Sequence, residues 1–430
     1  MRKTITFAIA AVLLARPSHA RALDLETTLR EVAAGSPALA ARRAMVTAAE
    51  RRVSPAGAWD SPMLEVGVIN VPTSGRFDLE DMTMKMVGVS QRVPVFGSRG
   101  LSKRSAREAA GAEAAGSEMA EYEAWGMAFE AYGDSYYAGA LAREALNHRA
   151  VMDRLVSSAR ARYESGNGRL EDVLRAEAER ARSLVDLASF RAEEQQARAR
   201  LDALRGVVPG GTADTLEPPP APTVPADPAP WLAAVAPVHP RLRELDAQAN
   251  RYKFAARAAR RMVWPDLQLG LSYGLRQTLA DGMKQENMYS ATVGVMLPIF
   301  ARQRELAEGA EMDAMARASE AERRAAELDL LGQVRGTHAA ANAAQRTVSL
   351  LADTVVATQS RAVDASWVAY GAGSTDLWRV FEASHALYTE EIALQRARQD
   401  LVRAGARMLS LTGRGDLLGV ITPAVRRSGQ

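Results

Sequence analysis

The sequence of 430 residues is 47% hydrophobic and 24% charged, which excludes an intrinsically disordered chain. It contains no cysteine, so disulfide frameworks, thiolate metal sites, iron–sulfur clusters and cysteine nucleophiles are excluded as well. The formal net charge is +3, but four of the 54 basic residues lie in the first 22 positions. The remaining 50 basic and 51 acidic residues nearly cancel, so the charge does not indicate binding to nucleic acid.

The N-terminal segment has the pattern of a secretory signal peptide. Arg2 and Lys3 precede an apolar run of ten residues at 5–14, and a small-x-small cleavage motif ends at Ala22. We therefore expect residues 1–22 to be removed when the protein leaves the cytoplasm. No later stretch approaches 18 consecutive apolar residues, so a transmembrane helix is not expected.

An internal repeat organises the rest of the chain. Five short motifs recur in the same order, at a spacing that drifts only from 203 to 207 residues. The pairs are Ser36–Leu39 with His239–Leu242, Pro62–Gly67 with Pro265–Gly270, Val93–Phe96 with Leu297–Phe300, Tyr163–Gly166 with Tyr370–Gly373, and Leu204–Gly206 with Leu411–Gly413. We assign the first repeat to residues 23–213, a proline-rich linker to 214–230, the second repeat to 231–414 and a C-terminal tail to 415–430.

Each repeat is predicted to contain an opening helix, a β-hairpin, a very long helix and a shorter helix. The predicted segments are an opening helix at 27–53, hairpins at 62–95 and 265–299, long helices at 100–163 and 302–370, and shorter helices at 169–205 and 376–412. The 64 residues from 100 to 163 contain no proline and would extend about 96 Å as a helix. The linker, with seven prolines between 217 and 230, is expected to be neither helix nor central strand.

Small and apolar residues at alternating 4/3 spacing predict that the helices pack closely as a coiled coil. The stripes that show this spacing are Leu174, Ala178, Ala181, Val185 and Ala188, and Leu351, Val355, Thr358, Ala362 and Ala365. From the helices alone, a soluble structural coiled coil is the simplest interpretation. The hairpins inserted between the helices, in duplicate and behind a signal peptide, argue against it.

The predicted strands alternate between apolar and polar residues. In 266–275 every second residue is apolar, 289–295 repeats the pattern, and the strand at 83–93 follows it less regularly. Ten-residue segments with one apolar face suit a tilted membrane-spanning strand, and they also suit an ordinary half-buried antiparallel sheet. If the strands enter a membrane, four per chain cannot close a barrel. Two, three or four chains would then supply eight, twelve or sixteen strands.

These motifs together resemble the TolC family of outer-membrane efflux channels. The resemblance rests on the duplicated plan, on the strand exits at 93–96 and 297–300, and on two Tyr-x-x-Gly turns followed by Leu-x-x-Val. It implies a mainly α protein with a small β part. The implied homotrimer has a 12-stranded outer-membrane β-barrel, four strands per chain, that continues into a 12-helix periplasmic coiled-coil α-barrel. The segment 70–94 looks most like members that serve heavy-metal pumps.

The resemblance also implies partners and site residues. A periplasmic adaptor and an inner-membrane pump of the RND type would dock to the trimer, which would act as a passive exit duct held in outer-membrane lipid. The implied docking turns contain Tyr163, Gly166, Gly168, Gly371 and Gly373. The implied gate residues are Glu171, Asp172, Tyr370, Arg379 and Glu382.

The gate departs from the family pattern in two respects. Thr375 stands where better-known members carry Arg just after the second turn, and Arg379 stands where they carry Asp. We therefore expect a rearranged ion pair in which Arg379 faces Asp172 or Glu171. The alternative is that these charges are solvated residues in the first turn of a helix, where acidic residues favour the N-terminus.

No catalytic constellation, metal ligand set or cofactor motif stands out, so we expect neither an enzyme nor a cofactor. His148, His239, His338 and His385 are far apart in sequence and form no i, i+4 pair, and they are expected to be packing or surface residues. Two other functions stay open. A type I protein secretion channel would share the fold, and a soluble periplasmic coiled-coil structural or adaptor protein belongs to a different class.

Overall fold

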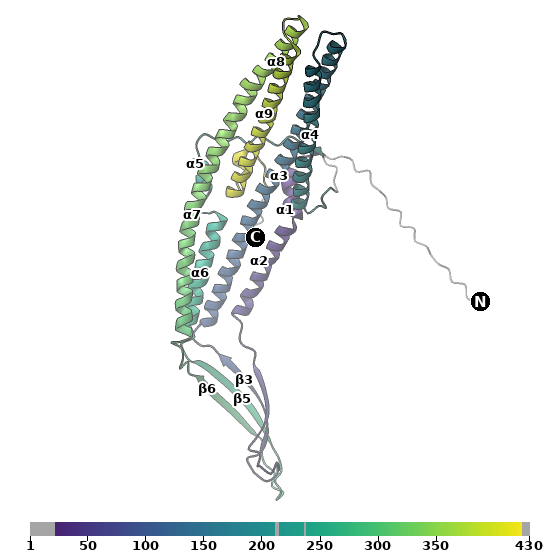
Figure 1. Ribbon diagram of the computed structural model, residues 1–430. Helices are drawn as coiled ribbons and strands as arrows, with labels where there is room; N and C mark the ends of the chain where they lie inside the picture. Colours follow the sequence, from purple (N-terminus) through teal and green to yellow (C-terminus); the bar gives the residue numbers. More distant parts are fainter. Residues whose placement is uncertain (1–21, 211–214, 236–237, 424–430) are drawn as a thin grey trace, which may run out of the picture. The chain divides into compact units, whose positions relative to one another are not determined.

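The structure is a computed structural model that describes residues 22–210, 215–235 and 238–423. The described chain is mainly helical with a small β part, which confirms the predicted fold class (Figure 1). The predicted signal peptide lies outside the described residues, except for Ala22. No helix among the described residues is both long enough and apolar enough to cross a membrane.

The chain divides into two compact units, and each draws on both sequence repeats. The described residues of the first unit fall within 22–37, 124–226 and 337–423, and those of the second within 38–123 and 227–336. Helices α3 (Ser98–Glu164) and α7 (Glu305–Leu350) contribute to both units.

The first unit consists mainly of long helices that are joined by tight turns. Its other elements are β1 (Ala22–Leu23), α1 (Leu25–Gly35), α4 (Leu170–Arg205), β4 (Thr215–Leu216), a π-helical turn (Leu351–Val356), α8 (Ala357–Gly371), α9 (Leu377–Thr412) and a 3-10 helix (Gly415–Leu418). The short strands β1 and β4 pair in parallel. Glycines let α3 and α9 approach closely, since a Cβ atom at Gly133 would collide with the side chain of Val402.

The core of the first unit lies between α3, α4 and α9. One cluster joins Leu141, Leu187 and Tyr388, and a second joins Leu155, Val173 and Val380. The buried positions on α4 are Val173, Ala176, Ser183, Leu187, Phe190, Leu201, Asp202 and Arg205.

The predicted packing stripe on α4 is wrong for contacts within the chain. Leu174 and Val185 are 57% and 67% exposed, whereas the neighbouring Val173 and the nearby Leu187 are buried. The helix carries two stripes with almost the same spacing, and only its docking against α3 and α9 decides which one is covered.

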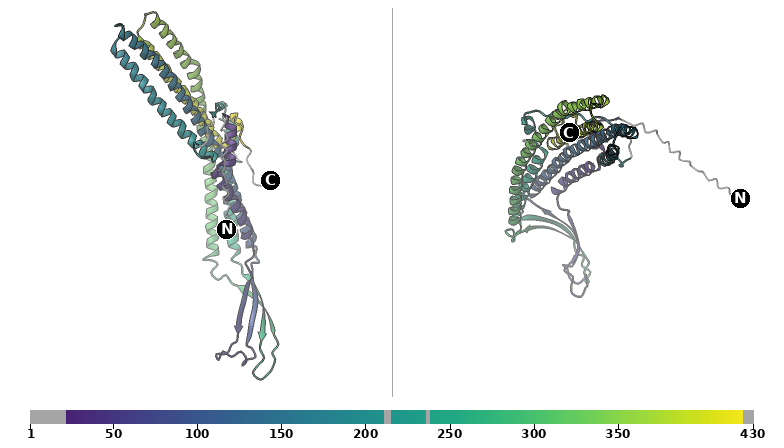
Figure 2. Two further views of the ribbon diagram at one scale, coloured as in Figure 1. Left: turned by 90° about the vertical axis from the view of Figure 1, so that its right-hand side faces the viewer. Right: turned by 45° about the horizontal axis from the view of Figure 1, so that its top comes forward.

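The second unit contains a four-stranded sheet and the helices that flank it in sequence. The helices are α2 (Pro37–Ala56), α5 (Ala229–Val235) and α6 (Pro240–Arg261), with the first parts of α3 and α7. The strands are β2 (Met63–Ile69), β3 (Met84–Val93), β5 (Asp266–Arg276) and β6 (Met288–Met296). They pair in the order β2-β3-β5-β6, all antiparallel. The left view of Figure 2 shows the strands side by side.

The register gives the sheet one apolar face. The pairs Leu64–Val89, Val89–Leu271 and Leu269–Val293 place these side chains on the same side. The apolar row is 44–74% exposed and comprises Leu64, Val66, Val87, Val89, Leu269, Leu271, Val293 and Val295. The other face carries small and polar residues such as Glu65, Ser90, Gln268 and Thr292, together with methionines that include Met84 and Met86. Within the described residues, β2 and β6 each pair on one side only.

Three predicted segments differ in detail. The opening helix at 27–53 is divided at Ser36, because Pro37 disfavours the helical conformation of the residue before it. His239 before Pro240 is extended for the same reason. The linker at 214–230 contains β4, and α5 starts within it, which proline allows in the first turn of a helix. A π-helical turn interrupts the long helix predicted at 302–370.

Candidate functional site

The two helix turns of the first unit have the same construction. Gly166 and Gly373 adopt positive φ angles of 78° and 70° after the ends of α3 and α8. In the first turn, Gly166 N–H donates to the Tyr163 carbonyl (3.0 Å), and Asn167 N–H donates to the Arg162 carbonyl (2.9 Å). The bonds from Gly373 and Ser374 to the carbonyls of Tyr370 and Ala369 repeat this pattern. Both are Schellman turns, which glycine favours because it adopts positive φ without strain.

The residues predicted to dock a partner differ in their surroundings. Tyr163 is 46% exposed beside the first turn. Gly168 is needed for a close approach, since a Cβ atom there would lie 2.9 Å from the backbone nitrogen of Tyr163. Gly371 is the last residue of α8, and a Cβ atom there would meet open space.

Tyr370 packs into the chain. Its hydroxyl lies 2.9 Å from the Ser158 hydroxyl, and the Arg162 guanidinium lies 5.3 Å from its ring centroid. Of the two tyrosines, Tyr163 therefore offers the freer surface at the turns.

The predicted ion pair between Arg379 and Asp172 or Glu171 is not formed within the described chain. Arg379 lies 3.4 Å from the Glu382 carboxylate one turn along α9, and Glu171 pairs with Arg175 along α4. Local i, i+3 and i, i+4 partners are within reach on one helix face, whereas the two helix starts would have to meet across the turns. Asp376, which caps α9, accepts a hydrogen bond from the Arg379 backbone N–H (3.1 Å).

Asp172 lines a cleft beside the first turn. The cleft has a volume of about 470 Å³ and is lined by residues of the first turn and by Asp376 and Leu377 at the start of α9, and its other charged residues are Arg162, Arg169 and Asp376. Arg175 stacks over the ring of Trp378 at 4.8 Å from the ring centroid. The starts of α4 and α9 therefore combine exposed charge with aromatic contacts.

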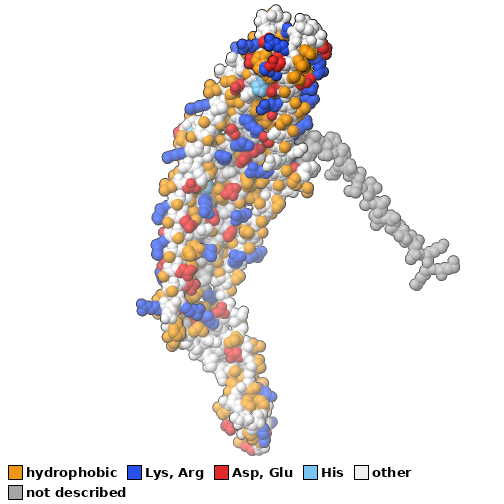
Figure 3. All heavy atoms as spheres, in the orientation of Figure 1, with side chains coloured by type: hydrophobic (Ala, Val, Ile, Leu, Met, Phe, Trp, Pro, Cys, Tyr) orange, Lys and Arg blue, Asp and Glu red, His pale blue; other side chains and the backbone are white. Residues whose placement is uncertain are grey.

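The two helix starts carry opposite charges at equivalent positions, which the sequence analysis missed. At the 207-residue spacing of the turns, Arg169 corresponds to Asp376, Asp172 to Arg379, and Arg175 to Glu382. Writing the two repeats side by side would have revealed this inversion. Elsewhere on the helices, acidic and basic side chains are interspersed (Figure 3).

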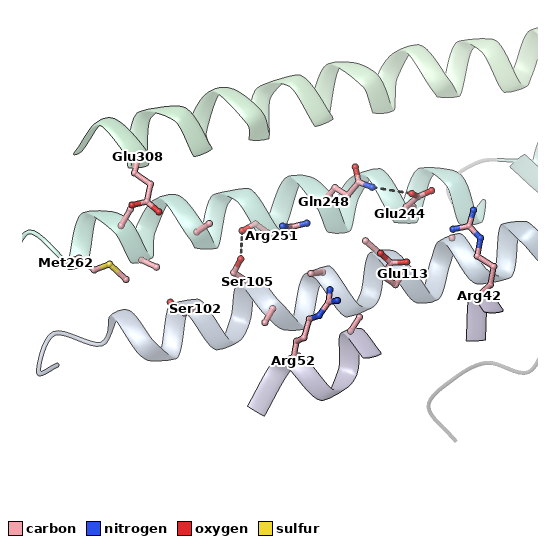
Figure 4. Close-up of a pocket in the computed structure, with 18 residues that line it drawn as sticks. Arg42, Arg52, Ser102, Ser105, Glu113, Glu244, Gln248, Arg251, Met262 and Glu308 are labelled. Carbon is pink, nitrogen blue, oxygen red and sulfur yellow. Dashed lines mark hydrogen bonds between the residues drawn. The ribbon is translucent and has the colours of Figure 1, made fainter. Parts of the chain in front are cut away.

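A polar groove of the second unit contains none of the predicted site residues. It has a volume of about 500 Å³ and lies between α2, α3 and α6 (Figure 4). The Ser105 hydroxyl donates to the Arg251 carbonyl (3.0 Å), and the Gln248 amide donates to Glu244 (3.2 Å). Because its lining mixes arginine with glutamate, the groove does not select one sign of ligand charge.

Two histidines that are far apart in sequence come together in the first unit. The ring centroids of His148 on α3 and His385 on α9 are 6.0 Å apart, and both rings lie beside Glu179 of α4. The sequence holds no local signal for this arrangement, because the three residues belong to three different helices.

Comparisons with known proteins agree with this architecture. Residues 234–414 match the family described as outer membrane efflux protein. Outer membrane efflux protein BepC of Brucella suis biovar 1 (strain 1330) is 29% identical over 305 residues, which cover 68% of this chain and 64% of BepC. The chain thus matches just under two thirds of the length of this curated relative.

Solved structures share the fold over most of the chain. The outer-membrane channel OprN has 19% sequence identity and a TM-score of 0.75, and the match covers 90% of each chain. The MtrE outer membrane channel of Neisseria gonorrhoeae has 17% identity and a TM-score of 0.75, with 90% of this chain and 88% of MtrE covered. The chain is therefore similar to outer membrane efflux proteins over residues 234–414, and over most of its length it has the fold of solved outer-membrane channels.

Proposed function

We propose that this protein is the passive exit duct of a tripartite efflux system, and that it works as a homotrimer. The sheet of the second unit carries the proposal: it has one exposed apolar face, and among the residues that the structure describes both of its edge strands pair on one side only. Unpaired strand edges are not viable in lipid, and four strands are too few to close a barrel. Three chains would supply twelve strands, as the resemblance to the TolC family implies.

The exposed stripe on α4 supports association between chains. Leu174 and Val185 lie outside the core of the chain, although their spacing suits coiled-coil packing. In a trimer this second stripe could contact a neighbouring subunit, while Val173 and Leu187 hold α4 to its own chain.

The charge inversion supports a gate at the helix turns. Where the start of α4 of one subunit meets the start of α9 of another, Asp172 would face Arg379, and Arg175 would face Glu382. Opposite charges at such a junction favour contact, whereas identical starts would repel. The exposed Tyr163 and the two glycine turns are the proposed docking surface for a periplasmic adaptor, through which an inner-membrane pump of the RND type would deliver cargo.

The resemblance of segment 70–94 to members that serve heavy-metal pumps makes metal ions the first cargo to test. The experiment compares a strain that lacks the gene with the same strain carrying it, during growth on metal salts and on organic toxicants. We expect the deletion to raise sensitivity to at least one of them. If the deletion instead abolishes export of a protein and leaves sensitivity unchanged, a type I secretion channel is the correct function.

A second measurement tests the assembly directly. The full chain should be recovered from the outer-membrane fraction only with detergent, as a trimer that separates on heating in gel electrophoresis. A monodisperse monomer in the soluble periplasmic fraction would contradict both the trimer and the channel, and would favour a periplasmic coiled-coil protein.

A further inference from the structure

Three potential metal ligands converge in the core of the first unit. Nε2 of His148 on α3, Nδ1 of His385 on α9 and a carboxylate oxygen of Glu179 on α4 all lie within 4.8 Å of one another. The Glu179 oxygen is 2.9 Å from the His385 nitrogen and 3.7 Å from the His148 nitrogen. Each ligand comes from a different helix, so the packing of α3, α4 and α9 creates the cluster.

The two ring nitrogens that face Glu179 are buried and make no hydrogen bond within the described chain. For His148 the separation is too long for a hydrogen bond, and the contact of His385 is at ion-pair distance without a hydrogen bond. His148 is only 5% exposed. Buried polar groups are nearly always hydrogen-bonded, so two such nitrogens aimed at one carboxylate indicate a missing partner.

Neighbouring side chains hold the rings in place. His148 stacks on Tyr388, with 4.1 Å between centroids and 8° between planes, and His385 stacks on Phe381 at 6.1 Å. The Tyr388 hydroxyl in turn donates to Asp186 (2.9 Å). The neutral imidazole is the form of histidine that binds metals. Ligands oriented in this way lose little freedom when a metal binds.

We propose that His148, Glu179 and His385 form a binding site for a divalent transition metal of the zinc class. Two imidazoles and one carboxylate are a ligand set found around zinc, and a tetrahedral site would require ligand atoms about 3.3 Å apart. The distances of 2.9 and 3.7 Å lie on either side of this value. Water would complete the coordination.

The bound metal would join the three core helices α3, α4 and α9. It would form coordinate bonds to two nitrogens that otherwise lack a partner. A divalent ion carries one more unit of charge than Glu179 neutralises, and the carboxylate of Asp186 near His148 would balance the remaining charge. This role is structural and does not depend on what the channel exports, so the proposal stands or falls separately from the proposed function.

The test uses the untagged full-length protein in detergent, stripped with a chelator and dialysed. Zinc bound per chain is measured by mass spectrometry, and Co²⁺ replaces zinc to report the coordination by visible absorption. We expect one metal per chain and the spectrum of four-coordinate Co²⁺. His385→Ala and Glu179→Gln should weaken binding by at least about tenfold, since even the outer-shell partners of metal ligands contribute that much.

His338→Ala is the matched control. His338 is also buried, but it lies on α7 and contacts the Pro225 carbonyl (2.7 Å), so its loss should leave metal binding unchanged. Zinc should raise the melting temperature of the wild-type protein and of this control, but not that of His385→Ala.

Two results would overturn the proposal. One is that the stripped wild-type protein gains neither bound metal nor the Co²⁺ spectrum. This measurement uses the wild-type protein alone, so it does not depend on the folding of a variant. The other is equal metal binding by the wild type, His385→Ala and Glu179→Gln, because the metal would then lie elsewhere.

Discussion

At the scale of single residues, the glycines of the two helix turns have distinct tasks. Gly373 has a φ angle of 70°, whereas Gly371 two residues earlier ends α8 without a positive φ. A Cβ atom at either position would meet no atom within 4 Å. Any difference between substitutions at these two sites therefore comes from the backbone conformation alone.

We expect Gly373→Ala to destabilise the first unit by about 1–2 kcal/mol, the cost of a left-handed conformation for an L-residue. Gly371→Ala should be neutral or stabilise by up to about 1 kcal/mol, because alanine favours helix. Denaturant unfolding with amide exchange at the turn measures both effects. If Gly373→Ala is as stable as Gly371→Ala, the left-handed turn is not present in solution.

A second residue-scale prediction concerns pH. Burial on α9, together with the charge of Glu144, raises the pKa of Glu391 to about 6, above its ordinary value of 4.5. The folded state therefore binds this proton more tightly than the unfolded state. The stability that it contributes is present below about pH 4.5 and is lost as the pH rises through about 6. Because Glu391 is only half-buried, solvent screening limits the effect to about 1 kcal/mol.

Glu391→Gln should remove this dependence. The variant is expected to gain about 1 kcal/mol over the wild type at pH 8 and to match it near pH 4.5. The measurement is the difference in unfolding free energy between the two proteins at both pH values, with Glu390→Gln as the control. A difference that does not change with pH would show that Glu391 is solvated.

At the scale of elements, the alternation of apolar and polar residues in the sequence corresponds to the two faces of the sheet. The irregular strand at 83–93 becomes clear in the register, where Val87 and Val89 lie on the apolar face and Met84 and Met86 on the other. Period-two patterns survive because neighbouring side chains of a strand point to opposite faces whatever the partner strand is.

Neighbouring positions on β5 test the proposed lipid contact. Leu269→Arg should block trimer assembly, because arginine costs about 2–4 kcal/mol on a lipid-facing strand at mid-bilayer. Gln268→Arg, on the opposite face of the same strand, should be tolerated. The yield of detergent-extracted trimer measures both, and equal yields would contradict the assignment of the apolar face to lipid.

At the scale of the whole molecule, the proposed gate depends on contacts between copies of the chain. Three-fold symmetry would repeat Asp172 and Arg379 around one axis, so each charge would need a partner of the opposite sign nearby. Within one chain, Arg379 pairs with Glu382 along the helix, which leaves contacts between subunits to be tested by function.

Arg379→Ala should raise single-channel conductance in planar bilayers, and Asp172→Ala should raise it by a similar amount. The double variant should add little, because both changes remove the same contact. Arg361→Ala, an exposed residue of α8, is the control and should leave conductance unchanged. If both single variants leave conductance and ion preference unchanged, Asp172 and Arg379 are solvated charges at helix ends and have no role in gating.

The sequence by itself determined the duplicated plan, the strands and their faces, and most helix boundaries, because these follow from local signals. Proline at 37 and 240 and glycine at 166 and 373 act on their own backbone and on the residues next to them. Pro37 is also a local signal for the division of the opening helix at Ser36. The prediction of one continuous helix at 27–53 did not take this signal into account.

Only the tertiary structure decided which stripe of α4 is buried, which residue pairs with Arg379, and that His148, Glu179 and His385 meet. Each of these depends on how helices from distant parts of the sequence rotate and dock against one another. A shift of one residue around a helix exchanges Val173 for Leu174 at the contact, while the spacing in the sequence hardly changes. The docking of α3, α4 and α9 is settled by the fit of their side chains in the core, and no single segment contains that information.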